Sequence, residues 1–189
     1  MSTALATLDH LPLTDVANLP DFRQVFDQYY EYVWSSLRRL GVHEADREDV
    51  ASDVFLRVHD RLDEFDPSRP LRPWLFAFAV RAASEYRKLA RHRTAVGRDE
   101  DSPGPVDPRP LPDQNAMAAE DARLVAAALE TLDLPLRAVF VLHEIEQESI
   151  PVVAEALGIP LGTAYTRLRS AREDFRVAVR RLRRKETSR

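Results

Sequence analysis

Hydrophobic residues recur every three or four positions in three segments of the first half of the chain, the spacing expected of one buried face of an α-helix. The first segment follows Pro20 and stops at Gly41, a residue type that commonly ends helices. Its apolar positions are Phe22, Val25, Phe26, Tyr29, Val33, Leu37 and Leu40. The pattern predicts one helix up to about residue 40, a second over about 46–65 and a third over about 73–91.

The second and third helices are predicted to bury one apolar stripe each. The stripe of the second helix is Val50, Val54, Phe55, Val58, Leu62 and Phe65. The stripe of the third helix is Trp74, Leu75, Phe78, Ala79, Ala82 and Leu89. Three prolines between them, at positions 67, 70 and 73, exclude a continuous helix and indicate a stiff loop, with Pro73 suited to the first turn of the third helix.

The second half of the chain has four more helical patterns and no pattern typical of a strand. They cover about 118–132, a segment that begins at Pro135, then 149–157 and 161–184. Residues 94–117 are rich in Pro and Asp and hold few branched apolar residues, a composition typical of a flexible linker. The sequence therefore predicts an all-α protein: a leader over 1–19, a helical domain over 20–93, the linker, a second helical domain over 118–185 and a tail over 186–189.

Composition narrows the class of protein. The 189 residues include no Cys, which excludes disulfides and thiol chemistry, and residues 1–20 lack the basic residues of a secretory signal. No apolar run approaches the ~18 residues of a membrane span. We expect a soluble, cytoplasmic protein that does not act at a membrane.

The net charge of −4 conceals strong segregation of charge along the chain. Residues 44–66 hold nine acidic residues and three arginines, whereas residues 69–93 hold seven basic residues and one acidic residue. Residues 161–189 hold ten basic and three acidic residues. Separate basic blocks attract polyanions even when the whole chain is acidic, so nucleic-acid binding remains open.

The segment 149–168 has the pattern of a helix-turn-helix. Ser149 is suited to cap the first helix, Ala154 is small where two helices must cross, and Gly158 permits a tight turn before Ile159. Thr163 or a neighbour is expected to cap the second helix. The inward stripe of that helix is Ala164, Leu168, Ala171 and Phe175.

The outward face of the second helix carries donors suited to a DNA major groove. The candidate DNA-binding residues are Thr163, Tyr165, Thr166, Arg167, Arg169, Ser170 and Arg172. Arginine near the start of a recognition helix can pair with guanine edges or with phosphates. The alternative is an ordinary solvated basic face, but the Ala-Gly-Ile spacing before it favours DNA recognition.

Two separate segments resemble the extracytoplasmic-function (ECF, group IV) sigma factors of bacterial RNA polymerase. EDVASDVFLRV at 48–58 and FDPSRPLRPWLFAFA at 65–79 are similar to domain two of that family, and GIPLGTAYTRLRSARE at 158–173 is similar to its region 4. The resemblance covers about 21–93 and 118–184, in the family's order. It implies a protein that binds core RNA polymerase and directs promoter-specific initiation.

The resemblance also implies roles for particular residues. The clamp helices of the polymerase largest subunit are expected to contact Asp49, Val50, Asp53, Val54, Arg57 and Val58, and the flap region is expected to contact region 4. Opening of the −10 element is expected to involve Arg69, Arg72, Trp74, Arg81, Glu85, Tyr86, Arg87, Lys88 and Arg91. Phe76 would add a ring to that surface, although the rings at 74 and 78 are also suited to the core. An anti-sigma factor is a further partner that the family often uses.

The chain departs from the family at two positions of this surface. Many members carry Asn where this chain has Arg81 and Asp where it has Glu85, and that Asn helps to read an extruded base. The −10 sequence that those family members prefer is therefore not predicted for this chain. The linker acids Asp99, Glu100, Asp101, Asp107 and Asp113 are compatible with a plain tether or with mimicry of RNA near its exit path.

The sequence predicts no catalytic site, metal or cofactor. His143-Glu144 begins like a zinc-protease HExxH motif, but Gln147 replaces the second His and His143 falls on a core face. Two alternatives to a sigma factor remain: a stand-alone helix-turn-helix regulator, and a degenerate sigma-like module that only binds other proteins. The first predicts sequence-specific DNA binding without polymerase, and the second predicts no initiation at any promoter.

Overall fold

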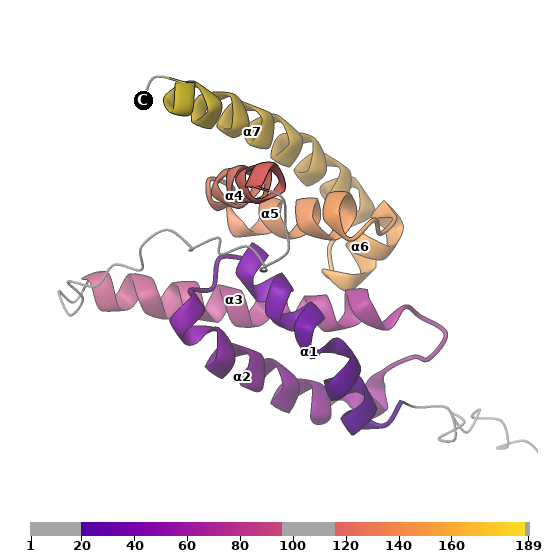
Figure 1. The fold of residues 1–189 in the computed structure, drawn as a ribbon. Coiled ribbons are helices and arrows are strands. Elements are labelled where there is room, and N and C mark those ends of the chain that lie inside the picture. Colours follow the sequence, from indigo (N-terminus) through magenta and orange to yellow (C-terminus); the bar gives the residue numbers. More distant parts are fainter. Residues whose placement is uncertain (1–19, 96–115, 188–189) are drawn as a thin grey trace, which may run out of the picture.

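The computed structural model describes residues 20–95 and 116–187, and these ranges contain seven α-helices and no strand. The long helix α3 (Leu71–Ala95) lies between the other helices (Figure 1). Helices α1 (Phe22–Arg39) and α2 (Arg47–His59) lie on one side of it. The predicted all-α class is confirmed for these ranges, whereas the leader 1–19 and the linker acids fall outside them.

Helices α1, α2 and α3 form the first helical unit because each buries most of the stripe that its sequence predicted; in α1 the exception is Phe26, which is 37% exposed. Val33, Leu37, Val54 and Leu75 are fully buried between them. Aromatic rings join α1 to α2, with the Phe26 and Phe55 centroids 4.7 Å apart. One member of the predicted stripe of α3 is wrong: the side chain of Leu89 is 59% exposed, because α3 continues past the core at this point.

The ends of these helices differ from the sequence expectation at two places. Helix α2 ends at His59 rather than near residue 65, and Leu62–Glu64 forms a 3₁₀ turn. Leu62 and Phe65 are buried as predicted, but spacing by three residues fits a 3₁₀ turn as well as an α-helix. Helix α3 begins at Leu71, two residues before the proline expected to start it, and Pro73 lies in its first turn.

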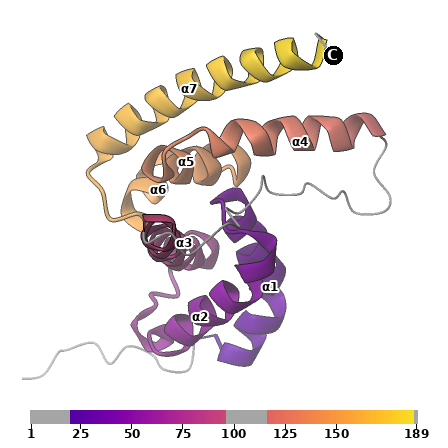
Figure 2. The same ribbon diagram turned by 90° about the vertical axis from the view of Figure 1, so that its left-hand side faces the viewer.

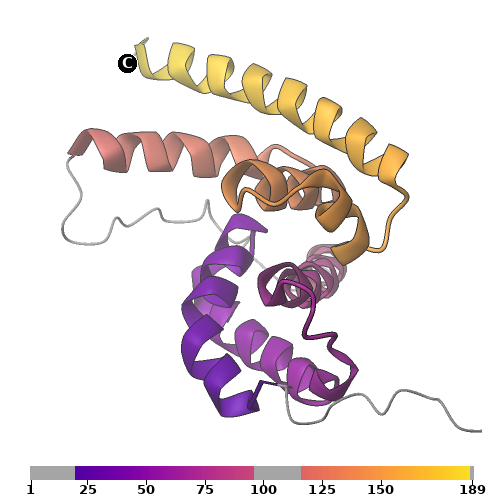
Figure 3. The ribbon, with the colours of Figure 1, turned by 90° about the vertical axis from the view of Figure 1, so that its right-hand side faces the viewer.

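The second helical unit begins with α4 (Ala116–Glu130) and α5 (Leu134–Phe140); the latter begins at Leu134, one residue before the predicted start at Pro135, which lies in its first turn. A π-helical turn at Val141–Ile145, which the sequence pattern did not predict, then leads to α6 (Ile150–Ala156). The last helix, α7 (Leu161–Thr187), packs against all three α-helices of this unit. In Figure 3, α7 lies above α4, and both lie above the helices of the first unit. Helical residues 94–95 and 116–117 correct the predicted ends of the linker.

The helix-turn-helix is formed by α6 and the start of α7, and its geometry follows from the glycine between them. Gly158 has φ +63°, and the amide of Ile159 donates to the carbonyl of Ala154 at 2.9 Å, which closes the turn. The expected inward stripe is confirmed for Ala164 and Leu168, which are buried. Ala171 is likewise buried, and Phe175 is half-buried against Phe140.

The two expected helix caps of this motif are not observed. Ser149 occupies the N-cap of α6, but its side chain makes no capping hydrogen bond. Thr163 lies in the first turn of α7 rather than before it, because the helix already begins at Leu161. Pro160 precedes that first residue, and its carbonyl accepts the bond from the Ala164 amide at 3.1 Å.

Substitution of Gly158 tests the turn directly. We expect Gly158→Ala to lower the free energy of unfolding by about 1–2 kcal/mol, because a Cβ disfavours positive φ. There is open space around this glycine, so the cost is conformational rather than steric. Gly162→Ala is the control, since Gly162 lies in α7 without a positive φ and also has open space. Chemical denaturation of both variants that gave equal losses would contradict this account of the turn.

The two helical units pack against each other across α3. Figure 2 looks along α3 and shows α5 and α6 on one side of it, with α1 and α2 on the other. Both α5 and α6 contact α3. No helix in the described ranges is long and apolar enough to cross a membrane. The result is one body in which the helix-turn-helix lies next to the proline-containing loop of the first unit.

Candidate nucleic-acid interface

The start of α7 presents the predicted recognition surface to solvent. Tyr165 is 56% exposed, and Thr166, Arg169 and Ser170 are also exposed. Thr163 and Arg167 are half-buried, so they offer less of their side chains. The exposed group combines an aromatic ring, hydroxyls and a guanidinium at the N-terminal end of a helix, which is the part of a recognition helix that reaches base edges.

Arg172, the last residue of the predicted set, is held by its own domain. Its guanidinium pairs with the carboxylate of Glu144 at 2.6 Å, and Arg172 Nη2 lies 3.5 Å from His143 Nε2. The other ring nitrogen of His143 lies 2.7 Å from the carbonyl of Glu148. His143 is therefore a structural histidine with partners on both nitrogens, in agreement with the rejection of the HExxH motif. The ion pair of Arg172 with Glu144 joins α7 to the π-helical turn, and the Arg172 side chain remains exposed.

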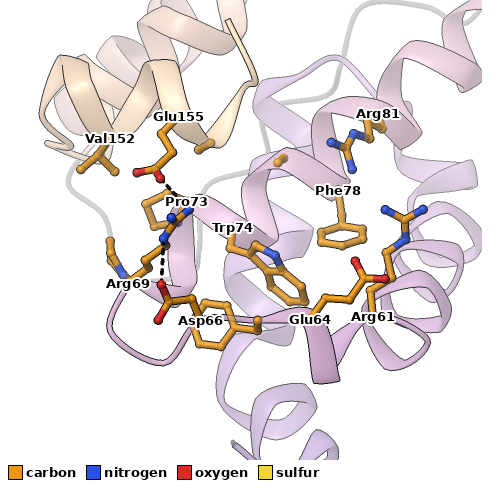
Figure 4. A pocket seen from close by; sticks show the side chains of 14 residues that line it. Arg61, Glu64, Asp66, Arg69, Pro73, Trp74, Phe78, Arg81, Val152 and Glu155 are labelled. Carbon is orange, nitrogen blue, oxygen red and sulfur yellow. Dashed lines mark hydrogen bonds and ion pairs between the residues drawn. The ribbon is translucent and has the colours of Figure 1, made fainter. Parts of the chain in front are cut away.

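A hollow of about 270 Å³ lies beside the proline-containing loop of the first unit. Its floor is aromatic: the Trp74 centroid lies 5.1 Å from that of Phe65 and 4.7 Å from that of Phe78 (Figure 4). Trp74 is half-buried, so the ring belongs to the core on one side and to the hollow on the other. From this position the Trp74 ring can both pack in the core and face a base in the hollow.

Arginines surround this aromatic floor. The guanidinium of Arg81 lies 5.7 Å from the Phe78 centroid, over the ring, and its side chain is exposed. Arg61, which the sequence reasoning did not select, also lines the hollow. The 3₁₀ turn that follows Arg61 ends the preceding helix, and the sequence pattern did not predict that turn. Rings flanked by guanidinium groups are the combination that binds unstacked bases with their phosphates.

The loop that carries Arg69 is held by Asp66. One oxygen of Asp66 accepts bonds from the amide and the hydroxyl of Ser68, at 3.0 and 2.7 Å. The other oxygen pairs with Arg69 at 3.1 Å. These bonds, with the nearby guanidinium, hold the pKa of the Asp66 carboxyl below its usual range. Arg72, further along, lies over the ring of Tyr32 at 5.4 Å from the centroid.

Several residues predicted for the −10 surface point elsewhere. Phe76 is fully buried, so the expectation that its ring faces bases is wrong. Tyr86 is half-buried and donates its hydroxyl to Asp46 at 2.7 Å, which ties α3 to the start of α2. Arg87 is half-buried, whereas Lys88 and Arg91 are exposed on the far part of α3.

The outer face of α2 is acidic and carries one largely exposed apolar side chain, Leu56. Asp49 and Asp53 are exposed, and Val50 is half-buried. The prediction that Val54 and Val58 contact a partner is wrong, because both side chains are fully buried in the core. Helical periodicity had placed them on the buried stripe, and the family resemblance alone placed them at an interface. Leu56, which the sequence reasoning missed, is 65% exposed on this face.

Glu85 belongs to this acidic face rather than to the aromatic hollow. Its carboxylate pairs with Arg57 at 2.6 Å, and this hydrogen bond is the main cause of a lowered pKa of Glu85 and a raised pKa of Arg57. The pair joins α2 to α3. Glu85, which was expected to help read DNA, is therefore engaged in an ion pair that joins two helices. The described part of the chain holds no cluster of His, Asp or Glu suited to a metal ion.

Comparison with protein families matches both helical units in order. The family model for Sigma-70 region 2 matches residues 25–93, and the model for Sigma-70 region 4 matches residues 122–175. The first covers the acidic face of α2 and the aromatic hollow. The second covers the helix-turn-helix.

Curated relatives extend this match over most of the chain. The RNA polymerase sigma factor CnrH of Cupriavidus metallidurans is 31% identical and aligns over 80% of this chain and 82% of its own. The ECF RNA polymerase sigma factor SigL of Mycobacterium tuberculosis is 32% identical, over 85% of this chain and 89% of its own.

Solved structures agree with that relationship. The structure of CnrH in complex with the cytosolic domain of CnrY has a TM-score of 0.57 at 29% identity and covers 82% of this chain and 85% of the CnrH chain. The sigma factor RpoE of Bartonella quintana, in complex with the anti-sigma factor NepR, shares the fold with a TM-score of 0.65 at 21% identity, over 85% of this chain and 97% of its own. The two matched regions, their order and the relatives above 30% identity together show that the chain belongs to the ECF sigma factors of bacterial RNA polymerase.

Proposed function

We propose that this sigma factor binds core RNA polymerase through α2, opens the −10 element with the aromatic hollow and α3, and reads the −35 element with the start of α7. Its contribution is binding energy rather than chemistry, since phosphodiester synthesis belongs to the polymerase. Three chemically different surfaces carry the proposal: the acidic face of α2, the aromatic hollow beside α3 and the start of α7. They follow one another in the order of the family's regions 2 and 4.

The −35 role is assigned to the exposed group at the start of α7. Tyr165, Thr166, Arg169 and Ser170 reach solvent together, and a major groove admits one helix. Arg169 is the member able to make a bidentate contact with guanine. Thr163 and Arg167 flank the group, and Arg172, braced by Glu144, is suited to a phosphate contact.

The −10 role is assigned to the hollow lined by Trp74, Phe78 and Arg81. A single-stranded base can stack on the half-buried Trp74, which the buried Phe78 supports from below, while Arg69, Arg72, Lys88 and Arg91 hold the backbone. Stacking is sequence-tolerant, whereas the guanidinium of Arg81 selects by hydrogen bonding. Because Arg81 stands where many relatives carry Asn, the chain is expected to prefer a different base at the position it contacts.

The polymerase contact is assigned to the exposed face of α2. Asp49, Asp53 and Leu56 lie about one turn apart along the exposed face of α2, so the surface combines an exposed apolar side chain with neighbouring carboxylates. This is the usual arrangement of a protein interface with a concentrated energetic centre. The clamp helices of the largest subunit are the proposed partner, with the flap region contacting the second unit. Action on polymerase places the protein in the cytoplasm.

Detection of promoter opening in solution tests the proposed sigma function. The protein is added to purified core polymerase with promoter-containing duplex DNA, and unpaired thymines are detected by permanganate. We expect reactive thymines near −10 only when both protein and core are present. Protection of a duplex by the protein alone would instead favour a stand-alone regulator. Core binding without opening at any promoter would favour a module that only binds proteins.

A further inference from the structure

Three residues of the segment that begins like a zinc-protease motif fasten one loop of the second helical unit. His143 and Glu144 lie in the π-helical turn, and Gln147 follows it with φ +62°. The side-chain amide of Gln147 donates to the carbonyl of Glu144 at 2.6 Å, and His143 Nδ1 lies 2.7 Å from the carbonyl of Glu148. The backbone amide of Glu148 donates to the carbonyl of Leu142 at 3.1 Å. Residues other than glycine with positive φ are concentrated at functional sites, so this fastened loop is a candidate for one.

The loop holds one guanidinium of the recognition helix in a fixed direction. Nε and Nη2 of Arg172 both lie 2.6 Å from the same carboxylate oxygen of Glu144. Nη2 also lies 3.5 Å from Nε2 of His143. Within residues 20–95 and 116–187, no hydrogen bond or ion pair occupies Nη1 of Arg172. Because a guanidinium is planar and rigid, two contacts on one edge fix the direction in which the other edge points.

Stability does not account for the pair of Arg172 and Glu144. Their side chains are 43% and 32% exposed. Ion pairs at such exposure contribute little to the free energy of unfolding, because solvent and salt screen them. The orientation that the two hydrogen bonds impose on Arg172 is therefore the main consequence of the pair.

Arg172 borders the surface that the proposed function assigns to the −35 element. A shallow hollow on α7 is lined by Tyr165, Leu168, Arg169, Arg172, Glu173 and Arg176. Arg172 follows Arg169 by three residues, which is about 4.5 Å along the helix axis. The two guanidinium groups are thus close enough for one to contact a base edge while the other contacts a flanking phosphate.

The carboxylate of Glu144 opposes DNA binding on charge alone. It lies 2.6 Å from the arginine that would meet a phosphate, and it repels the DNA backbone. If the role of Glu144 were electrostatic only, its removal would tighten promoter binding. A role in orientation predicts the opposite sign, because an arginine that is free to move loses side-chain entropy when it binds a phosphate.

We propose that Glu144 is a positioning residue for −35 recognition, which holds the Arg172 guanidinium so that its free edge engages a DNA phosphate. Phosphate contacts fix the register and orientation of a recognition helix without reading sequence. The anchor at Arg172 therefore sets where Tyr165 and Arg169 meet base edges, and Glu144 influences sequence discrimination without touching DNA. The inference rests on the proposed function, because it requires α7 to read the −35 element.

The first experiment measures the affinity of the complete complex of this protein and core polymerase for a responsive promoter as salt is varied. Arg172→Ala should reduce the magnitude of the slope of log affinity against log salt by about 0.9, the value for one phosphate contact. Glu144→Ala should weaken promoter binding several-fold although it removes a negative charge, and the magnitude of its slope should also fall. Glu144→Gln, which keeps the side-chain size and one oxygen acceptor, should give a smaller loss.

Glu173→Ala is the matched control for removal of a carboxylate. Glu173 lines the same hollow on α7, but it pairs with Arg176 and Arg180 of its own helix, at 3.5 and 3.8 Å, and not with Arg172. Its removal should leave promoter affinity equal or higher. Affinity for core polymerase should be unchanged in Glu173→Ala and in Glu144→Ala, since neither residue lies on α2.

The second experiment separates orientation from stability. The charge swap Glu144→Arg/Arg172→Glu keeps an ion pair between the π-helical turn and α7. Its midpoint of chemical denaturation should recover relative to the two single variants, whereas its promoter affinity should stay low because a carboxylate now faces the phosphate. Discrimination against the same promoter with substitutions in its −35 element should fall in Glu144→Ala and stay unchanged in Glu173→Ala.

The outcomes distinguish this role from a structural one. Promoter affinity that is unchanged or raised in Glu144→Ala overturns the positioning role. Recovery of promoter affinity in the charge swap also overturns it, because the pair would then only hold the fold. An unchanged salt slope in Arg172→Ala removes the phosphate contact. Failure of the unaltered protein to give core polymerase affinity for any promoter overturns the proposed function instead.

Discussion

Arg169→Ala is expected to lower promoter-specific transcription by about 5–150-fold, because one bidentate arginine contact with a base discriminates by about 1–3 kcal/mol. The side chain is exposed at the start of α7 and lies beside Tyr165 and Ser170, which would share the same groove. The change removes no buried group, so the fold should be retained. Run-off transcription at a responsive promoter measures the effect.

The control for Arg169→Ala removes the same charge from another exposed position of α7. Arg181→Ala lies three helical turns further on, away from the motif that carries recognition. It should change transcription by less than about threefold, as expected of one exposed charge in high dielectric. Affinity for core polymerase should be unchanged in both variants. A loss of core binding in Arg169→Ala equal to its loss of transcription would contradict the division between the two units.

Leu56→Glu is expected to weaken binding to core polymerase by about 30–1000-fold, the range that corresponds to about 2–4 kcal/mol at the centre of an interface. Leu56 is 65% exposed while its neighbours Val54 and Phe55 are buried, so the loss arises at the contact and not in the core. The glutamate also adds a third carboxylate beside Asp49 and Asp53. Titration of labelled protein with core measures the affinity.

A matched leucine on another helix controls for hydrophobicity. Leu89 of α3 is exposed to a similar extent, 59%, but lies outside the acidic face. Leu89→Glu should leave core affinity within about threefold of the unaltered protein, as is usual for a surface change away from an interface. Equal losses in the two variants would show that α2 is not the principal contact. A normal affinity for Leu56→Glu would remove the assigned role of that face.

Helical periodicity predicted the elements well because most helices here bury a single continuous stripe. Val33, Leu37, Ala164 and Leu168 are buried on the faces that their spacing indicated. Periodicity failed where two structures share a spacing, as at Leu62 and Phe65, where a 3₁₀ turn satisfies the same pattern as an α-helix. It also gave no signal for the π-helical turn, whose extra backbone residue per turn has no characteristic side chain.

The sites were harder to predict because a family resemblance names positions without their exposure. Val54 and Val58 were expected at a polymerase interface, yet the stripe that contains them forms the core, and Leu56 takes the exposed place. Phe76 was expected beside DNA, but it lies on the opposite side of α3 from the hollow and is fully buried.

Contacts between the units were beyond sequence reasoning for a different reason. Arg39 and Glu146 are separated by 107 positions, and Arg69 and Glu155 lie on different units of the fold. Single charges at such distances carry no local pattern, and many other arginines and glutamates in the chain were equally plausible partners. Only the packing of α3 against α5 and α6 selects these pairs.

The most direct test of the central claim is transcription in vitro from a fragmented source genome, with purified core polymerase in the presence and absence of this protein. The account predicts protein-dependent transcripts whose start sites share −35 and −10 elements, and it predicts that Leu56→Glu and Arg169→Ala each remove them. An absence of protein-dependent transcripts from a preparation that forms a stable complex with core would contradict the claim that this chain directs promoter-specific initiation.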